Sequence, residues 1–179
     1  RGVVNPMTVS FAGISDDKVT VSAPGLTKGA KVGQYNWNVT GINSDKAVLT
    51  VSGKLEDGST VSDKKEFIIR EIPRPVTSAR GITTGSNKGN KEDLKVSTIS
   101  VLFPDFVFDV TTTVVSFEVY CPGSPTIQVQ GSRFNEAALR AIDKTKRGDQ
   151  VTIQNVVTKL QGAEGYRMKP SSPFIWEIQ

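Results

Sequence analysis

The amino-acid sequence predicts a mainly β protein built from two tandem β-sandwich domains. Leucine is scarce, whereas valine, isoleucine and threonine recur in short runs bounded by glycine, proline, asparagine and aspartate. β-Branched residues favour strands, and the bounding residues favour turns. The 179 residues are 37% hydrophobic and 22% charged, which is ordinary for a folded chain that can bury a core.

The first domain is predicted to cover residues 1–72. Its strand-like runs are separated by turn-forming stretches such as SDD, PGLTKG and GINSD, and they occupy residues 7–14, 18–23, 34–39, 46–55 and 59–71. Short strands at this close spacing are typical of an immunoglobulin-like sandwich. Tyr35, Trp37 and Val39 alternate with two asparagines, so one face of that strand is apolar and Trp37 is expected in the core.

A hairpin is predicted within this domain at Asp57-Gly58. A two-residue turn needs positive φ angles, and glycine adopts them without strain. The dipeptide separates residues 46–55 from residues 59–71, and both runs have the composition of strands. We therefore expect these runs to pair as antiparallel neighbours.

The segment Pro73-Arg74-Pro75 is predicted to link the two domains. Two prolines remove two backbone donors and fix φ, so a sheet cannot continue through them. They closely follow the strand-like run FIIRE. Because such a link is stiffer than one of glycine and serine, it is expected to restrict the mutual orientation of the domains. The second domain is then residues 73–179, a β domain that carries one helix.

The second domain is predicted to begin with a mobile loop and then a long strand. Residues 80–93 are rich in Gly, Asn, Ser and Lys and have few apolar anchors. Residues 105–121 have the longest β signal, but their apolar side chains change from even to odd positions near Thr112. This change of phase predicts a bulge or a bend between two strands. Asp105 and Asp109 are expected on one strand face, about 13 Å apart, as solvated edge charges.

One α-helix is predicted over about residues 135–147. Asn135 can cap its start, and Gly148 suits its end. The apolar stripe that would pack on the sheet consists of Ala138, Leu139, Ala141 and Ile142. Two strands are expected to follow at residues 150–160 and 173–179, the second with an apolar face of Phe174, Trp176 and Ile178.

Common hydrolase designs are excluded because the chain contains no histidine. It can form neither a Ser-His-Asp nor a Cys-His arrangement, and it has no histidine ligand for zinc. The single cysteine, Cys121, cannot form an internal disulfide and is expected to be a small apolar residue rather than a nucleophile. There is also no phosphate-binding glycine loop. We predict no enzyme and no catalytic, metal or cofactor site.

The charge distribution does not indicate a nucleic-acid-binding protein. The net charge is +4, but the basic residues are scattered along the chain. One local cluster lies late in the predicted helix, where cations offset the carbonyl end of the macrodipole, and it consists of Arg140, Lys144, Lys146 and Arg147.

Five stretches, taken in order, carry a resemblance to a known family. They are NPMTVSFAGI (5–14), FIIREIPRPV (67–76), FVFDVTTTVVSFEV (106–119), RGDQVTIQNV (147–156) and SPFIWEI (172–178). In order and spacing they resemble the C-terminal periplasmic half of the PorM/GldM family, the gliding-motility and type IX secretion proteins of Bacteroidota. The resemblance covers essentially the whole chain.

The resemblance implies a structural, energy-transmitting role in the periplasm. Members of that family are anchored in the inner membrane by an N-terminal helix and pair there with a motor-like partner. They cross the periplasm as dimers, and their last domains meet an outer-membrane-associated ring. Because the chain begins at Arg1 and has no apolar run long enough to cross a membrane, we expect a distal fragment. Its expected partners are a second copy and the ring proteins, whereas the motor partner would bind regions absent from the chain.

Six basic residues in the 80–93 segment and at the end of the helix are predicted to contact a partner: Arg80, Lys88, Lys91, Lys144, Lys146 and Arg147.

The alternative function is a sandwich-type carbohydrate-binding or adhesion module. Such modules expose aromatic rings on a flat face, whereas Trp37 and Trp176 alternate with polar residues as core residues do. The exposure of these two rings therefore discriminates between the two functions.

Overall fold

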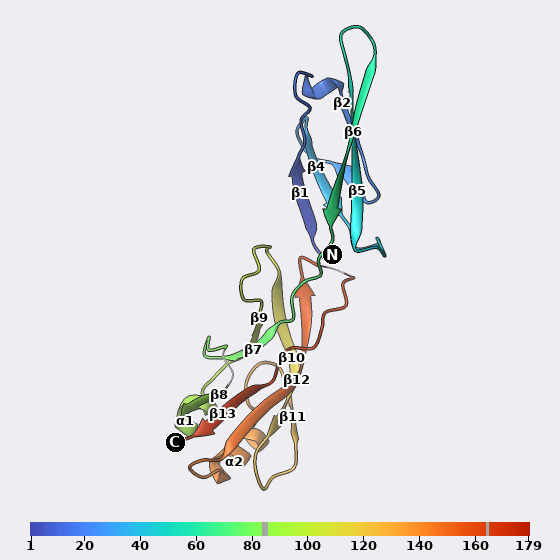
Figure 1. Cartoon of the computed structure of the whole chain (residues 1–179). Coiled ribbons are helices and arrows are strands. Elements are labelled where there is room, and N and C mark those ends of the chain that lie inside the picture. Colours follow the sequence, from blue (N-terminus) through green and yellow to red (C-terminus); the bar gives the residue numbers. More distant parts are fainter. Residues whose placement is uncertain (84–85, 164) are drawn as a thin grey trace. The chain divides into compact units, whose positions relative to one another are not determined.

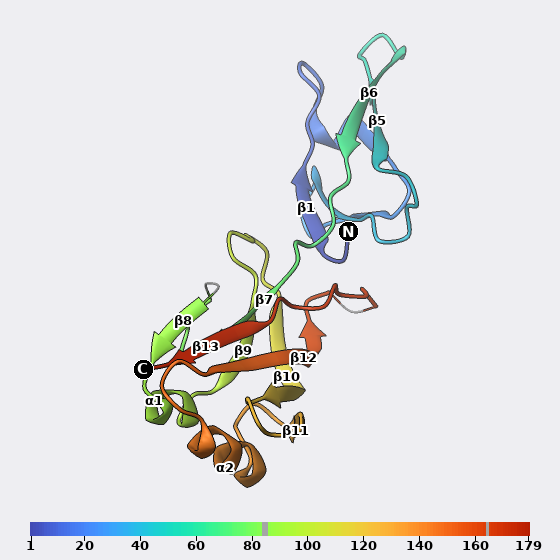
Figure 2. The same cartoon turned by 60° about the horizontal axis from the view of Figure 1, so that its bottom comes forward.

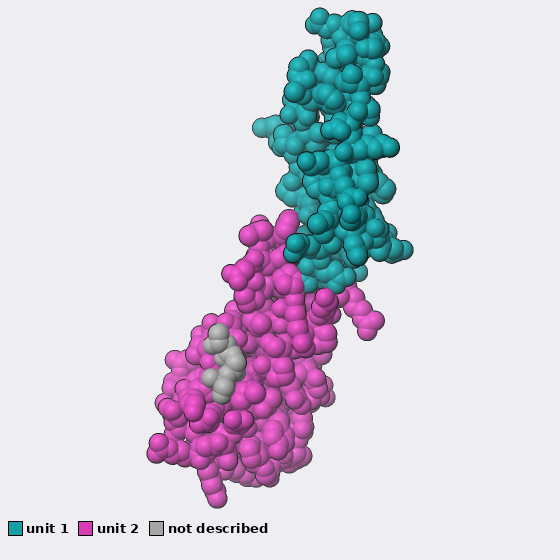
Figure 3. All heavy atoms as spheres, in the orientation of Figure 1, with its two compact units in different colours: residues 1–72, 163–166 teal, residues 73–162, 167–179 magenta. Residues whose placement is uncertain are grey.

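The computed structural model describes residues 1–83, 86–163 and 165–179 (Figure 1). Strands make up 47% of the chain and helices 10%, so the predicted mainly β class is confirmed. The chain forms two compact units, which Figure 3 shows in different colours. Unit 1 comprises Arg1–Ile72 and Ala163–Tyr166, and unit 2 comprises Pro73–Gly162 and Arg167–Gln179.

Unit 1 consists of two three-stranded antiparallel sheets (Figure 1). One has the strand order β1-β4-β3 and the other β2-β5-β6. The strands are β1 (Val4–Thr8), β2 (Val19–Ser22), β3 (Leu26–Lys28), β4 (Gln34–Asn38), β5 (Lys46–Lys54) and β6 (Thr60–Ile68). A single turn of 3-10 helix, Asp16–Lys18, precedes β2.

Trp37 is at the centre of the core of unit 1. Burial alternates along β4 as predicted, and Trp37 is only 3% exposed. It clusters with Ala47 and Leu49 of the opposite sheet, and its ring meets Phe67 edge-on with the centroids 5.3 Å apart. Its indole nitrogen donates a hydrogen bond to the carbonyl of Pro24 at 2.8 Å. Because both its apolar surface and its polar group have partners inside the unit, Trp37 joins the two sheets.

The predicted hairpin is present between β5 and β6, but its turn is longer than expected. The backbone nitrogen of Leu55 donates to the carbonyl of Ser59 at 2.9 Å, so the turn contains three residues instead of two. Gly58 takes the positive φ, 85°. The Asp57 carboxylate accepts hydrogen bonds from the hydroxyl (2.6 Å) and the backbone nitrogen (2.9 Å) of Ser59, which lower the pKa of Asp57. Its side chain thus closes the turn.

Two predictions about the strands of unit 1 are wrong. The run 7–14 was expected to be a strand, but β1 begins at Val4 and ends at Thr8, and the remainder forms only an isolated bridge between Phe11 and Ile14. The stretch that contains β3 was expected to be a turn. A short edge strand is held by backbone hydrogen bonds to one neighbour, so it does not need the apolar alternation of a longer strand.

Unit 2 is built on a five-stranded sheet of order β11-β10-β12-β13-β8 (Figure 2). These strands are β8 (Ser86–Gly89), β10 (Thr111–Tyr120), β11 (Ile127–Gln130), β12 (Gln150–Gln161) and β13 (Phe174–Ile178). Only the pair β13–β8 is parallel among them. A two-stranded antiparallel sheet joins β7 (Val76–Ala79) to β9 (Ile99–Leu102).

Helix α2 (Glu136–Lys144) and the five-stranded sheet share one core. Ile142 is fully buried in the cluster that also contains the apolar face of β13, which is formed as predicted by Phe174, Trp176 and Ile178. The predicted cap is confirmed, because the side-chain oxygen of Asn135 accepts a hydrogen bond from the backbone nitrogen of Ala138 at 2.9 Å. The helix ends before residue 147, since Thr145 is extended and buried.

The prediction of a mobile loop over residues 80–93 is wrong where the structure describes it; residues 84 and 85 lie outside the described part. Strand β8 lies in this segment and pairs with β13. A second helix, α1 (Lys91–Lys95), follows it, so the prediction of a single helix is also incomplete. Asn90 caps α1, and Leu94 is fully buried. One buried leucine anchors the helix and backbone pairing holds the strand, so neither gives a periodic apolar signal.

The predicted long strand of residues 105–121 begins later than expected. Residues 103–110 form a loop, and β10 starts at Thr111. The change of apolar phase therefore marks the end of a loop. Strand β10 does carry irregularities, but they lie further along, where its register with β12 shifts at Val115 and again beside Asn155. Asn155 has a φ of 50°, a conformation that asparagine tolerates better than most residues.

Candidate interaction surfaces

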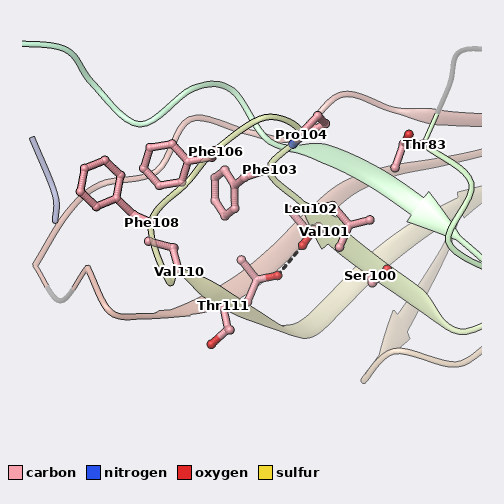
Figure 4. Close-up of a pocket in the computed structure, with 11 residues that line it drawn as sticks. Thr83, Ser100, Val101, Leu102, Phe103, Pro104, Phe106, Phe108, Val110 and Thr111 are labelled. Atoms are coloured by element: carbon pink, nitrogen blue, oxygen red, sulfur yellow. Dashed lines mark hydrogen bonds between the residues drawn. The ribbon is translucent and has the colours of Figure 1, made fainter.

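An open apolar groove in unit 2 is formed by the loop 103–110 and by β9 (Figure 4). Phe103, Phe106 and Phe108 lie in a row, with centroids of neighbouring rings 5.9 and 5.3 Å apart. The groove has a volume of about 640 Å³, within the range of roughly 300–1,000 Å³ typical of ligand sites. All its lining residues are uncharged. It can therefore bind apolar side chains, but its lining offers no acid or base for catalysis.

The first part of the groove loop is a tight turn. The backbone nitrogen of Phe106 donates to the carbonyl of Phe103 at 3.4 Å. Between them, Pro104 fixes the second position, and Asp105 has a φ of 59° at the third. Proline followed by a residue of positive φ is the pattern of a type II turn. This turn places Phe103 and Phe106 on the same side of the loop (Figure 4).

The second part of the loop is held by its neighbours in unit 2. The hydroxyl of Thr112 donates to the carbonyl of Val101 at 2.7 Å, which ties the end of the loop to β9 (dashed in Figure 4). Gly162 packs so closely that a Cβ at this position would stand 2.4 Å from the carbonyl oxygen of Asp109. The φ of Gly162 is also positive, at 84°. Glycine is therefore required at 162 for the loop to lie where it does.

Asp105 and Asp109 lie in this loop, so their predicted place on a strand face is wrong. Both are exposed, and between them Val107 has 91% of its surface exposed. The groove was missed from the sequence because its apolar run has the composition of a strand. Pro104 and the change of phase were the two signals that a loop precedes β10.

The predicted link, Pro73-Arg74-Pro75, makes several contacts within unit 2. Arg74 donates from Nε to the carbonyl of Pro170 at 2.9 Å, and the carbonyl of Pro75 accepts from the backbone nitrogen of Ser172 at 3.2 Å. Pro75 is buried, whereas Pro73 and Arg74 are exposed. Strand β7 begins directly after Pro75 and bridges to Ser172. The segment is therefore held at its C-terminal end by residues 170–172.

Two of the six predicted contact residues form ion pairs inside unit 2. Arg80 pairs with Asp93 of α1, and Lys88 lies 3.0 Å from the carboxylate of Glu177. The pair of Lys88 and Glu177 connects neighbouring strands β8 and β13, which hold these residues in register. Both pairs are largely exposed, so their net contribution to stability is small.

The other predicted contact residues surround the end of α2. Lys91 donates from Nζ to the carbonyls of Asp143 (2.8 Å) and Thr145 (3.0 Å), so it satisfies the last carbonyls of that helix. Three further cations here are exposed and have no side-chain ion pair with any described residue: Lys144, Lys146 and Arg147. They form a basic surface that remains open to solvent.

Cys121 is in the core of unit 2 and does not have the environment of a nucleophile. It is completely buried, and burial raises the pKa of its thiol to about 11, with the negative charge of Asp149 acting in the same direction. A nucleophilic cysteine needs a lowered pKa and access to solvent. Within residues 1–83, 86–163 and 165–179 there is also no cluster of three or more histidine, cysteine or acidic side chains that could hold a metal ion.

Two protein-family models match the chain, one over each unit. The family model described as the GldM third domain matches residues 1–70, and the model described as the GldM C-terminal domain matches residues 73–179. The chain belongs to the GldM family. No individual curated protein matches the chain.

Members of the GldM family are structural components of the gliding-motility and type IX secretion machinery, and the family is not a known enzyme family. The predicted resemblance is therefore confirmed. Proteins of the GldM family are membrane-anchored and have periplasmic C-terminal domains. In the part of this chain that the structure describes, no helix has the length and apolar character needed to cross a membrane. Pro73 is the first residue of the second GldM match.

Proposed function

We propose that this chain is the distal part of a periplasmic, dimeric, non-enzymatic shaft of the type IX secretion system. In this role it connects an inner-membrane motor, bound through regions outside this chain, to a ring associated with the outer membrane. The observation that carries the proposal is the order of the two family matches, the GldM third domain followed by the GldM C-terminal domain. No cofactor or catalysis is required for such a role.

The link between the two matched segments supports mechanical transmission. A shaft loses transmitted strain wherever its connections bend freely. Pro73 and Pro75 restrict φ, and the two hydrogen bonds to residues 170 and 172 limit the freedom of the segment further. We propose that the link stays stiff under load for these reasons.

The burial of the tryptophans weighs against the alternative of a carbohydrate-binding or adhesion module. Trp37 is 3% exposed and Trp176 5% exposed, and Tyr35 and Phe174 are buried as well. A sugar-binding platform needs accessible aromatic faces, whereas a load-bearing domain needs filled cores. These four residues therefore favour the shaft.

Mass measurement tests the proposed function directly. Light scattering after gel filtration should give twice the chain mass, and mixing with purified ring proteins should give a heavier complex that contains the chain. If the chain binds no ring protein, either alone or within a longer stretch of the same protein that includes the preceding regions, the proposal is wrong.

The stiff link has its own test. Replacing Pro73 and Pro75 together with glycine should broaden the distance distribution between spin labels placed in unit 1 and unit 2 and should reduce secretion in cells. Pro125→Gly, at an exposed proline before β11, provides the matched control. Unchanged distances and normal secretion in the double variant would contradict the role given to the link.

A further inference from the structure

We propose that the groove of loop 103–110 is a docking surface for a segment of another protein that presents apolar side chains flanked by lysine or arginine. This inference goes beyond the proposed function and does not rest on it, because it is drawn from one surface of unit 2 alone.

The loop presents apolar surface to solvent instead of burying it. Val107 is 91% exposed and Leu102 of β9 is 39% exposed, whereas the rings of Phe103, Phe106 and Phe108 are only partly covered. Covering such surface contributes roughly 25 cal/mol per Å². Contiguous exposed apolar residues with a polar border are a mark of protein-binding sites. Covering the apolar surface of the loop would therefore contribute to the affinity for a partner.

Both charged residues of the groove loop are acidic. Asp105 and Asp109 lie on either side of Val107 in the sequence, and both are exposed. In the described residues, neither carboxylate forms a salt bridge with Lys or Arg, and no charged residue lines the groove itself. Two carboxylates without a salt bridge, in the loop that lines an apolar groove, complement a ligand with an apolar centre and basic flanks.

The same charges disfavour the simplest self-association. If two copies met groove to groove, the symmetric contact would bring Asp105 and Asp109 of one copy close to the same carboxylates of the other. Like charges at that distance repel and disfavour the pair. A two-fold dimer can also place the groove of each copy on a different surface of the other copy, and the mass measurement below separates that arrangement from a foreign partner. A partner with basic flanks avoids the repulsion of the groove-to-groove contact.

The groove is already formed before any partner binds. The turn at Pro104, the bond from Thr112 to Val101 and the close packing of Gly162 on Asp109 fix the loop from both ends. A surface that is ordered before binding loses less entropy when it binds. The groove is therefore suited to capture a short extended segment.

A phage-displayed library of short random peptides provides the probe. The library is selected on the intact chain, with Leu102→Ser as the counter-selection target, since this partly exposed side chain lines the groove and lies outside the buried core. Enriched peptides should combine aliphatic or aromatic residues with lysine or arginine. Amide chemical shifts on binding one such synthetic peptide should be confined to residues around 101–112.

Matched charge variants then test the role of the two carboxylates. In low salt, Asp105→Asn and Asp109→Asn should each weaken binding by about threefold, as expected for exposed charge pairs, while Glu56→Gln on the hairpin of unit 1 should have no effect. Asparagine keeps the positive φ of Asp105 accessible. Folding of each variant is checked by its amide spectrum.

Three outcomes would overturn the inference. Peptides enriched without basic residues would contradict the role of the charges. No enrichment over the Leu102→Ser chain would contradict the role of the apolar groove. A dimeric mass of the chain alone that Leu102→Ser reduces to that of a monomer would assign the groove to a second copy. The binding of ring proteins is measured separately, so the proposed function and this inference can fail independently.

Discussion

Gly89 lies directly against the indole of Trp176, and a Cβ on Gly89 would stand 2.3 Å from Cζ2 of that ring. The two residues belong to neighbouring strands, β8 and β13, which form the parallel pair of the sheet. Trp176 is 5% exposed and belongs to the core of unit 2. The absence of a side chain at 89 therefore decides how closely the polar edge strand can approach the aromatic core.

Substitution of this glycine should displace the tryptophan. We expect Gly89→Ala to destabilise the chain by about 1–3 kcal/mol, because the ring or the strand must move to avoid overlap. Urea unfolding followed by circular dichroism measures the loss. Gly41→Ala is the control, since no atom lies within 4 Å of a Cβ at position 41. Equal stability of the two variants would show that β8 adjusts without cost.

Gly162 should hold the groove loop in its position. Gly162→Ala places a methyl group against the carbonyl of Asp109 in a backbone of positive φ, so we expect loop 103–110 to shift and unit 2 to lose about 1–3 kcal/mol. Gly123→Ala has a similar positive φ but no neighbour within 4 Å, so it reports the backbone strain alone. Amide shifts of residues 103–110 should move in the first variant only. If both variants give the same spectrum there, the close contact does not hold the loop.

Lys91 and Lys144 should differ although both were predicted to contact a partner. Lys91→Met removes two hydrogen bonds to the end of α2, and we expect a loss of about 1 kcal/mol in the free energy of unfolding. Lys144→Met removes an exposed cation and should leave stability within about 0.5 kcal/mol of the original. Chemical denaturation compares the two. A larger effect of Lys144→Met on partner binding than on stability would assign the open basic surface to recognition.

Cys121 should be inert to thiol reagents near neutral pH. With a pKa of about 11 and complete burial, the native thiol should react with a disulfide reagent at pH 8 only at the rate at which the chain opens. Because the native pKa is raised above the unfolded value, this thiol contributes stability that is fully present below the unfolded pKa of 9.0 and is lost as pH rises toward 11. Cys121→Ala should flatten this part of the pH profile. Fast labelling of the folded chain at pH 8 would contradict the burial and the raised pKa of the Cys121 thiol.

Much of the core followed from the sequence because burial leaves a periodic pattern. The alternation around Trp37 and along β13 identified residues that are buried, and Asn135 identified the start of α2 from the chemistry of its side chain. In each case a local pattern of two to four residues carries the information. The Asp-Gly signal also located the hairpin, although the turn proved one residue longer.

The elements that the sequence did not reveal are those held by backbone pairing or by single contacts. Strand β8 is polar and depends on its bonds to β13, and helix α1 depends on one buried leucine. Neither produces a repeated apolar pattern. The same limit applies to the groove, where residues 103–110 have the composition of a strand but lie in a loop that Gly162 and Thr112 position.

The mainly β class, the centres of the two cores, the cap of the main helix and the family were all readable from the sequence. They depend on composition, on the spacing of apolar side chains and on stretches of characteristic order, which are local properties of the chain. Only the tertiary structure showed that Ala163–Tyr166 belongs to unit 1, that Lys91 closes the end of α2, and that three phenylalanines line an uncharged groove. These features join residues far apart in the chain, and their geometry depends on packing distances that a linear pattern does not contain.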